Sequence, residues 1–354
     1  MLDDVSEKVL MLEKPDIADA TLLACLRDFY GVDNAQLEFL PLGADRNTAV
    51  YRAASAEATY FVKLRGGFDE MTVIVPKLLH DAGVDHVIAP IPNALGHLWT
   101  PVEDFHLILY PFVAGTNGFE RELTAQNWID FGRALKSIHS TSLPPAAMQR
   151  IPKETFSSDV RRKVSLYQTV AATTPYRDPI AAEFAAFMTG KKAEISALVH
   201  HADRLGALLR ARTLDFIPCH ADIHVGNLLI TPSDHLYVVD WDTLLLAPKE
   251  RDLMFAGMGL GSSAAYSADQ QTALFYQGYG PVDIDPIALA YYRCERIVQD
   301  VFEYTEQILF TEGDSADRWE GLRQFRSQFE PNAVVERAFQ SIAALPPDAG
   351  SHTP

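Results

Sequence analysis

The chain has few cysteines and no long apolar run. Its three cysteines, Cys25, Cys219 and Cys294, are an odd number and lie far apart, so we expect no disulfide framework and a reducing compartment. No apolar run approaches the roughly 20 residues that cross a bilayer. The first ten residues, MLDDVSEKVL, are acidic where a signal peptide would be basic. We therefore expect a cytoplasmic protein with no membrane partner.

Basic residues are also scarce, with 30 lysines and arginines against 47 aspartates and glutamates and a formal net charge of −17. Proteins that bind nucleic acids use Lys and Arg at the phosphates, so we expect no nucleic-acid partner. The acidity suits solubility and is compatible with a cationic ligand, although screening beyond about 8 Å makes local carboxylates matter more than the total. The length of 354 residues allows two domains or lobes.

The expected elements divide the chain into a small β-rich part and a larger helical part. Apolar residues at helical spacing predict helices over 19–30 and 69–82, and short β-like runs lie between Phe39 and Leu64. Two extended runs, LWTPV and FHLILYPFV, follow. Beyond Gly115 the pattern is helical, beginning with a helix that Thr124 can cap. We therefore predict an N-terminal lobe over 1–112 and a helical C-terminal lobe over 113–354.

One β-rich island, CHADIHVGNLLITPSDHLYVVDWD, interrupts the helices. Its Pro-Ser-Asp turn predicts a hairpin between NLLI and LYVVD. Polar side chains beside a buried strand are costly unless they are paired or used. The island holds His220 and Asp222, then Asn227 five positions after Asp222, and Asp240 thirteen positions further on.

This order matches the catalytic loop of protein kinases, which perform phosphoryl transfer. In that chemistry the first Asp orients a hydroxyl group and accepts its proton, while the Asn oxygen and the second Asp hold Mg²⁺ against the phosphates. We expect His220 to organise the loop and not to act as the base. The alternative is a surface hairpin, since Asp and Asn favour turns. The order of residues favours phosphoryl transfer.

The β-rich part supplies candidates for nucleotide binding. Lys63 ends the strand-like run TYFVKL, and kinases use a strand lysine on the phosphates, paired with a helix glutamate. Glu70 is the candidate partner, with Asp69 adjacent to it. The stretch LGADRNTAVYR lacks the G-x-G-x-x-G of protein kinases, but Gly43 and Asn47 lie where a loop would cover the phosphates.

Together these stretches resemble the aminoglycoside phosphotransferases, whose fold is protein-kinase-like. The resemblance runs from about residue 20 to 340 through GADRNTAVYR, YPFVAGTNGF, CHADIHVGNLLI and VVDWDTLLLAPKERDLMF. APKERDLMF and YYRCERIVQD are most similar to the branch of the family that acts on spectinomycin. The resemblance implies an α+β, two-lobed fold with a small β-rich N-lobe and a larger, mainly helical C-lobe.

The resemblance also implies a role for each candidate residue. It implies that ATP is the donor, with GTP as the alternative, and that Mg²⁺ is required. By position it assigns the catalytic Asp (Asp222), the magnesium ligands (Asn227, Asp240), the phosphate lysine and its partner (Lys63, Glu70), and the adenine contacts (the Pro111 carbonyl and the Val113 N–H). The last choice agrees with chemistry, because proline has no N–H to donate.

For the substrate, the resemblance implies transfer to the 9-hydroxyl of spectinomycin, a cationic aminocyclitol, and hence antibiotic resistance. Two secondary amines in this substrate require carboxylates, and Asp242, Glu295 and Asp300 are the candidates. Two alternatives stay open: an ATP-dependent kinase of another small alcohol, such as choline, a sugar or another antibiotic, and a pseudokinase that binds nucleotide without turnover. We expect a monomer or a weak homodimer.

Overall fold

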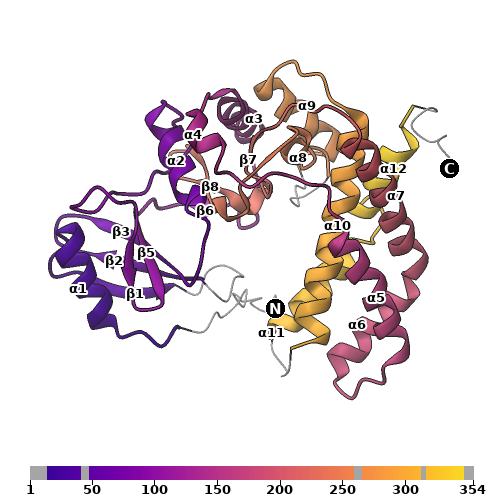
Figure 1. The fold of residues 1–354 in the computed structure, drawn as a ribbon, viewed down its shortest axis with the longest axis horizontal. Helices are drawn as coiled ribbons and strands as arrows, with labels where there is room; N and C mark the ends of the chain where they lie inside the picture. The colour runs from indigo at the N-terminus through magenta and orange to yellow at the C-terminus, as the bar shows by residue number, and fades with distance from the viewer. Residues whose placement is uncertain (1–13, 41–47, 259–264, 312–315, 347–354) are drawn as a thin grey trace. The chain divides into compact units, whose positions relative to one another are not determined.

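A computed structural model describes residues 14–40, 48–258, 265–311 and 316–346 (Figure 1). The chain packs as two compact units. The first contains the chain up to Arg121 together with 140–151 and 226–244, and the second contains the rest. The division falls inside the polar island, between Val225 and Gly226. These units differ from the lobes predicted at 1–112 and 113–354, and that division stays a prediction.

The first unit is built on a five-stranded antiparallel sheet in the order β1-β2-β3-β5-β4. Its strands are β1 (Gln36–Leu40), β2 (Thr48–Ala54), β3 (Thr59–Arg65), β4 (Thr100–Val102) and β5 (Phe105–Pro111). The helices α1 (Asp19–Tyr30) and α2 (Met71–Asp81) confirm the helices predicted over 19–30 and 69–82.

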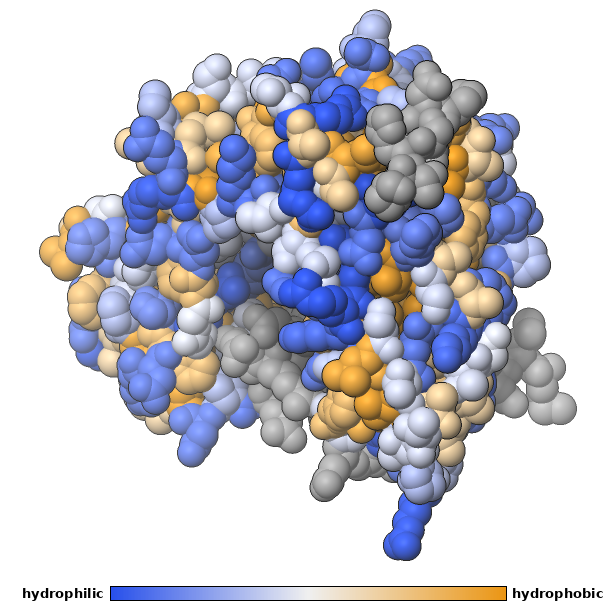
Figure 2. Space-filling view, turned by 45° about the vertical axis from the view of Figure 1, so that its right-hand side comes forward, coloured by the Kyte–Doolittle hydropathy of each residue, from blue (hydrophilic) through white to orange (hydrophobic). Residues whose placement is uncertain are grey.

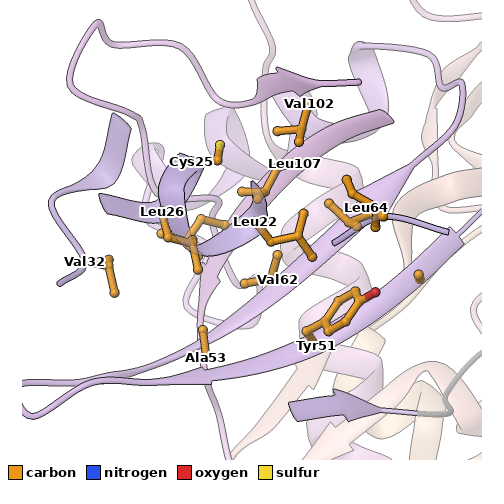
Figure 3. Packing of buried hydrophobic residues seen from close by; sticks show 13 residues of the cluster. Leu22, Cys25, Leu26, Val32, Tyr51, Ala53, Val62, Leu64, Val102 and Leu107 are labelled. Carbon is orange, nitrogen blue, oxygen red and sulfur yellow. The ribbon is translucent and has the colours of Figure 1, made fainter. Parts of the chain in front are cut away.

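Helix α1 covers one face of this sheet. Its apolar side chains Leu22 and Leu26 are fully buried and lie beside Val62 and Leu107 of the strands (Figure 3). Burying aliphatic side chains of this size stabilises the unit by about 1.5–3 kcal/mol each. The helix ends where Gly31 adopts φ +67°, a left-handed conformation that glycine takes without strain. The sheet is thereby a rigid base for the residues on β3.

The first unit also contains the predicted hairpin. Strands β8 (Leu228–Ile230) and β9 (Leu236–Val238) pair antiparallel, and β6 (Thr116–Asn117) joins the far side of β8. The 3₁₀ turn η1 (Val225–Asn227) directly precedes β8, and η2 (Trp241–Thr243) follows β9. The short helix α4 (Pro145–Met148) also belongs to this unit. Gly115 lies so close to β8 that a Cβ there would come within 2.7 Å of the Ile230 carbonyl oxygen, so the position requires glycine.

The second unit is mainly helical. Its helices are α3 (Ala125–Ser140), α5 (Asp159–Thr173), α6 (Pro179–Gly190), α7 (Lys192–Arg210), α8 (Glu250–Leu253), α9 (Ala268–Tyr279), α10 (Pro286–Leu309), α11 (Ala316–Ser327) and α12 (Val334–Ala343). Strands β7 (Ile217–Cys219) and β10 (Leu245–Ala247) form a small antiparallel pair. The long helix α10 packs against α5, α7, α11 and α12 (Figure 1). It is therefore the central element of this unit.

Local signals explain where these helices begin. The Thr124 hydroxyl accepts the N–H of Asn127 at 3.1 Å, and the Asn127 side chain accepts the N–H of Thr124 at 3.0 Å, which confirms the predicted cap of α3. Asp285 caps α10 by accepting the N–H of Ile287 at 3.0 Å, and Pro286 occupies the first helical position. At the start of both helices, a side chain thus accepts an N–H group that has no partner within the helix.

The surface is consistent with the composition. The face shown in Figure 2 is mostly hydrophilic, with apolar residues in smaller groups. Cys25, Cys219 and Cys294 are buried and free, which confirms that they form no disulfide. Among the described residues, no helix is long and apolar enough to cross a membrane.

Candidate active site

The loop after β7 carries the predicted catalytic aspartate, and Asp252 holds its backbone. The Asp252 carboxylate, from α8, accepts the N–H of His220 at 2.9 Å and the N–H of Ala221 at 2.6 Å. Ala221 has φ +69°, a left-handed conformation that is costly for a residue with a Cβ. Two hydrogen bonds to one buried carboxylate compensate for that strain, so the loop presents Asp222 in a fixed direction.

Further polar groups hold Asp252 from behind. Its Oδ2 lies 2.9 Å from Nε2 of His139, and Nδ1 of His139 lies 2.9 Å from the hydroxyl of Tyr279. Burial alone would raise the pKa of Asp252, but the contacts with His139, His220 and the loop N–H groups outweigh it and lower the pKa. His139, Cys219 and Asp252 are close enough to bind a metal ion, yet the carboxylate is already engaged. Asp252 is therefore a structural residue of the loop.

Asp222 itself is contacted on both carboxylate oxygens. The guanidinium of Arg296 on α10 donates from Nη1 to Oδ1, and Nε2 of His224 lies 3.6 Å from Oδ2. Its own N–H donates to Nδ1 of the buried His220 at 3.3 Å. This last contact fits the expectation that His220 organises the loop.

These neighbours keep Asp222 ionised. Burial would raise the pKa of its carboxyl group, but the imidazole of His224 and the charge of Arg296 outweigh burial and lower the pKa to about 2. A carboxylate with so low a pKa is a weak base. It can orient a hydroxyl group strongly, but it can take the proton only when the hydroxyl oxygen has become acidic through bonding to phosphorus.

In the first unit, Lys63 on β3 is paired with two carboxylates. Its Nζ lies 3.0 Å from Oδ1 of Asp240 and 2.9 Å from Oδ2 of Asp242. Arg65 lies two positions along the same strand, and its Nη1 donates to the other oxygen of Asp242 at 2.6 Å. Burial would lower the pKa of Lys63, but Asp240 and Asp242 outweigh it and raise the pKa, so the ammonium group keeps its charge.

The partner predicted for Lys63 is not the one observed. Glu70 stands at the start of α2, is about half exposed, and pairs with Arg150. Asp69 is likewise engaged locally, because its Oδ1 accepts the N–H of Met71 at 2.8 Å. The structure therefore brings Lys63 together with Asp240 and Asp242 and not with Glu70.

The predicted magnesium ligands lie at one end of the hairpin. The N–H of Val239 donates to the carbonyl of Asn227 at 3.0 Å, which continues the register of β8 and β9 and sets Asn227 one position from the level of Asp240. The Asp240 side chain is about half exposed, and its backbone has φ +63°. An amide oxygen and an accessible carboxylate suit Mg²⁺, so these residues fit the predicted ion. Their role as ligands stays a prediction.

The segment predicted to contact adenine follows β5. Pro111 pairs with Tyr60 of β3, and the N–H of Phe112 donates to the Thr59 carbonyl at 3.1 Å. Since Pro111 has no N–H and that of Phe112 is engaged in the sheet, Val113 carries the next N–H along the segment. Gly43 and Asn47, predicted to cover the phosphates, lie outside the described residues.

The carboxylates predicted to bind the substrate have protein partners. Glu295 on α10 is buried and paired with Arg161, whose side chain is fully buried. Asp300, one turn beyond Arg296, accepts from the Nε of Arg296 at 2.9 Å and from Gln328 at 2.9 Å. Asp242 bridges the cations of β3. Contact between any of these carboxylates and a substrate stays a prediction.

Sequence reasoning did not single out three residues that the structure places at these groups: Arg65, His224 and Arg296. For Arg296 a signal was present, because it stands four positions before Asp300, the spacing of an ion pair along a helix. For Arg65 the signal was strand alternation, which puts it on the same face as Lys63.

Comparison with known proteins adds independent evidence. A family model described as the phosphotransferase enzyme family (APH) matches residues 39–284. The structure of spectinomycin phosphotransferase APH(9)-Ia in complex with ADP and spectinomycin is 35% identical, covers 93% of this chain and 99% of that chain, and superposes with a TM-score of 0.84. The AMP-bound complex of the same enzyme is 34% identical, covers 91% and 98%, and has a TM-score of 0.80.

Two other relatives have lower sequence identity to this chain. Protein StrN of Streptomyces griseus is 29% identical over 225 residues, which are 61% of this chain and 67% of its own length. Choline kinase LicA from Streptococcus pneumoniae is 14% identical, covers 92% of this chain and 99% of its own, and has a TM-score of 0.51, so it shares the fold alone. These likenesses confirm the α+β, protein-kinase-like fold predicted from the sequence.

Proposed function

This chain belongs to the phosphotransferase enzyme family, and we propose that it transfers the γ-phosphoryl group of ATP to the 9-hydroxyl of spectinomycin. The observation that carries the proposal is the likeness to an enzyme whose structure holds ADP and spectinomycin, over 93% of this chain. Phosphorylation would inactivate the antibiotic, so the proposed activity confers resistance. The acidic composition, with a net charge of −17, is compatible with a substrate that carries two ammonium groups.

Asp222 is the proposed catalytic residue. It accepts a hydrogen bond from the substrate hydroxyl, whose oxygen forms a bond to the γ-phosphorus while the bond from that phosphorus to the bridging oxygen of ADP breaks. The hydroxyl proton passes to Asp222. Its pKa of about 2 places this transfer late, after the new bond has made the hydroxyl acidic. Most of the acceleration then comes from position and charge.

The nucleotide is held by residues of the first unit. Lys63 is the proposed contact for the phosphate oxygens, and Asn227 and Asp240 would hold Mg²⁺, which when bound neutralises charge on those oxygens. The Pro111 carbonyl and the Val113 N–H are the proposed contacts of adenine. For the substrate amines, Asp300 and Asp242 remain the better candidates, because the Glu295 carboxylate is buried against Arg161.

An acceptor panel tests the proposal. Purified protein is incubated with Mg-ATP, or with Mg-GTP, and with spectinomycin, an aminoglycoside, choline or a simple sugar, and ADP or GDP release is followed. We expect spectinomycin to be the acceptor with the highest kcat/KM. Turnover of choline or a sugar without spectinomycin would assign the chain to another small-alcohol kinase. Asp222→Asn is the control for catalysis by this site, and nucleotide binding without turnover of any acceptor would identify a pseudokinase.

A further inference from the structure

One arginine of α10 connects the catalytic loop to the helical core. Nη1 of Arg296 donates to Oδ1 of Asp222, and Nε of the same guanidinium donates to Oδ1 of Asp300 at 2.9 Å. The other oxygen of Asp300 accepts from Nε2 of Gln328 at 2.9 Å, just beyond the end of α11. The planar guanidinium thus spans two carboxylates, and the second carboxylate is itself anchored.

Phe255 supports both groups that face Asp222. The Cζ atom of Arg296 lies 5.8 Å from the centre of its ring, and the ring of His224 packs edge-on at 6.3 Å. Phe255 is buried, so its ring is a fixed support. The two oxygens of Asp222 therefore have different partners: Oδ1 is bound by an arginine that also contacts Asp300 and the Phe255 ring, while Oδ2 faces the imidazole of His224 at 3.6 Å.

We infer that Arg296 is a positioning residue for the catalytic carboxylate: by binding Asp222 and Asp300 at once, it fixes the direction in which Asp222 meets the substrate hydroxyl. This inference rests on the proposed function, since it takes Asp222 as the residue that accepts the hydroxyl proton. In the reaction the proton passes to the Asp222 carboxylate as the bond from the hydroxyl oxygen to phosphorus forms and the bond from phosphorus to ADP breaks. A carboxylate free to rotate would offer either oxygen and lose orientation.

The charges around Asp222 agree with this role of Arg296. His220 lies behind the loop, His224 faces Oδ2 and Arg296 binds Oδ1. Burial raises the pKa values of Asp300 and Glu303 on α10, and the nearby charge of Asp222 raises them further. Arg296 contacts two of these three carboxylates, Asp222 and Asp300. Without it, Asp222 would face two like charges, and both its direction and its ionisation would change.

The test is a set of substitutions at Arg296 read through kcat and KM separately. For Arg296→Ala we expect kcat with spectinomycin to fall about tenfold to a hundredfold, with KM for ATP unchanged within about twofold. Guanidinium chloride at low, non-denaturing concentration should restore part of kcat, relative to equal sodium chloride. Arg296→Lys should retain more of kcat than Arg296→Ala, because an ammonium group keeps the charge but not the two-sided geometry.

Arg293→Ala is the matched control, because Arg293 lies one turn earlier on α10 and donates to the carbonyl of Ala256 at 2.8 Å and to Ser341 at 2.7 Å. It removes a guanidinium from the same helix without touching Asp222, and guanidinium should not rescue it. A wild-type kcat in Arg296→Ala would overturn the inference. So would a loss that guanidinium leaves unchanged and that Arg293→Ala reproduces.

A measurement without substrate separates this inference from the proposed function. Aspartate labelled with carbon-13 at the carboxyl carbon reports the titration of Asp222, which Asp222→Asn assigns. In Arg296→Lys and Arg296→Ala the titration should move to higher pH, by roughly one pH unit or more in the alanine variant. An unchanged titration overturns the inference. If the wild-type chain phosphorylates no acceptor, the proposed function fails, while this titration still decides whether Arg296 holds Asp222.

Discussion

Nζ of Lys63 lies 2.9 Å from Oδ2 of Asp242, so the strand lysine pairs with a carboxylate of the 3₁₀ turn after β9. Protein kinases pair this lysine with a glutamate of a helix. Arg65 donates to the other oxygen of Asp242 at 2.6 Å, and both cations project from the same face of β3. Asp242 thus serves as the common anchor for two basic side chains.

Substitution at Asp242 should therefore impair nucleotide use more than substitution at Glu70. We expect Asp242→Asn to lower kcat/KM for ATP about tenfold, because Lys63 and Arg65 lose their shared anchor. Glu70→Ala should leave kcat/KM for ATP within about twofold of wild type, since Glu70 pairs with Arg150 near the surface. Steady-state kinetics with varied ATP measure this difference. An equal loss in Glu70→Ala would show that Glu70 is the partner of Lys63 during catalysis, as in protein kinases.

The buried Asp252 should contribute strongly to stability. Asp252→Ala leaves His139 and the N–H groups of His220 and Ala221 without their acceptor, so we expect a loss of about 3 kcal/mol in the free energy of unfolding. Urea unfolding at neutral pH measures this. Asp269→Asn is the control, because Asp269 is 93% exposed and its removal should change little. A loss below about 1 kcal/mol in Asp252→Ala would show that the loop at His220 and Ala221 keeps its conformation without this carboxylate.

The pKa of Asp222 predicts how stability changes in acid. The folded protein holds this pKa at about 2, below the ordinary value of about 3.9 in an unfolded chain, so ionised Asp222 favours the folded state above about pH 4. That contribution, about 2 kcal/mol, is lost as pH falls from 4 through 2. In Asp222→Asn the free energy of unfolding should fall less steeply over this range. Chemical unfolding at several pH values tests this, and parallel curves would contradict the low pKa.

The magnesium requirement of the reaction should depend on the residues at the end of the β8–β9 hairpin. Chelation with EDTA should abolish phosphoryl transfer, and Asn227→Ala should raise the Mg²⁺ concentration for half-maximal rate about tenfold, because an oxygen ligand is lost. Asp234→Asn is the control on the same hairpin: Asp234 lies in the turn and contacts Arg121 at the surface. Magnesium titrations of kcat give both values. A normal magnesium requirement in Asn227→Ala would remove this residue from the metal site.

The features predicted from the sequence are those whose signals are local. The helices at 19–30 and 69–82, the cap at Thr124 and the β8–β9 hairpin each depend on residues within a short window. The motif of Asp222, Asn227 and Asp240 could likewise be recognised in the sequence, because phosphoryl transfer requires these residue types at this spacing.

The features that escaped prediction depend on partners far apart in the chain. Arg161 reads as a surface residue of a polar helix, yet it is fully buried against Glu295, 134 positions later. Lys63 pairs with Asp242, and Glu70 pairs with Arg150, because tertiary packing brings these residues together. No local sequence pattern encodes either pair. The short pair β7–β10 joins Cys219 to Leu245 and has too few residues for a period-two signal. Pairing of charges is thus the least predictable part of the site.

The most direct measurement of the central claim is the structure of the product formed from Mg-ATP and spectinomycin. We predict that proton and phosphorus NMR of the purified product show a single phosphate ester on the 9-hydroxyl, and that Asp222→Asn forms it at least about a hundredfold more slowly. Unmodified spectinomycin, recovered under conditions in which the wild-type protein binds ATP, would contradict the account. So would product formation by Asp222→Asn at a rate close to that of the wild type.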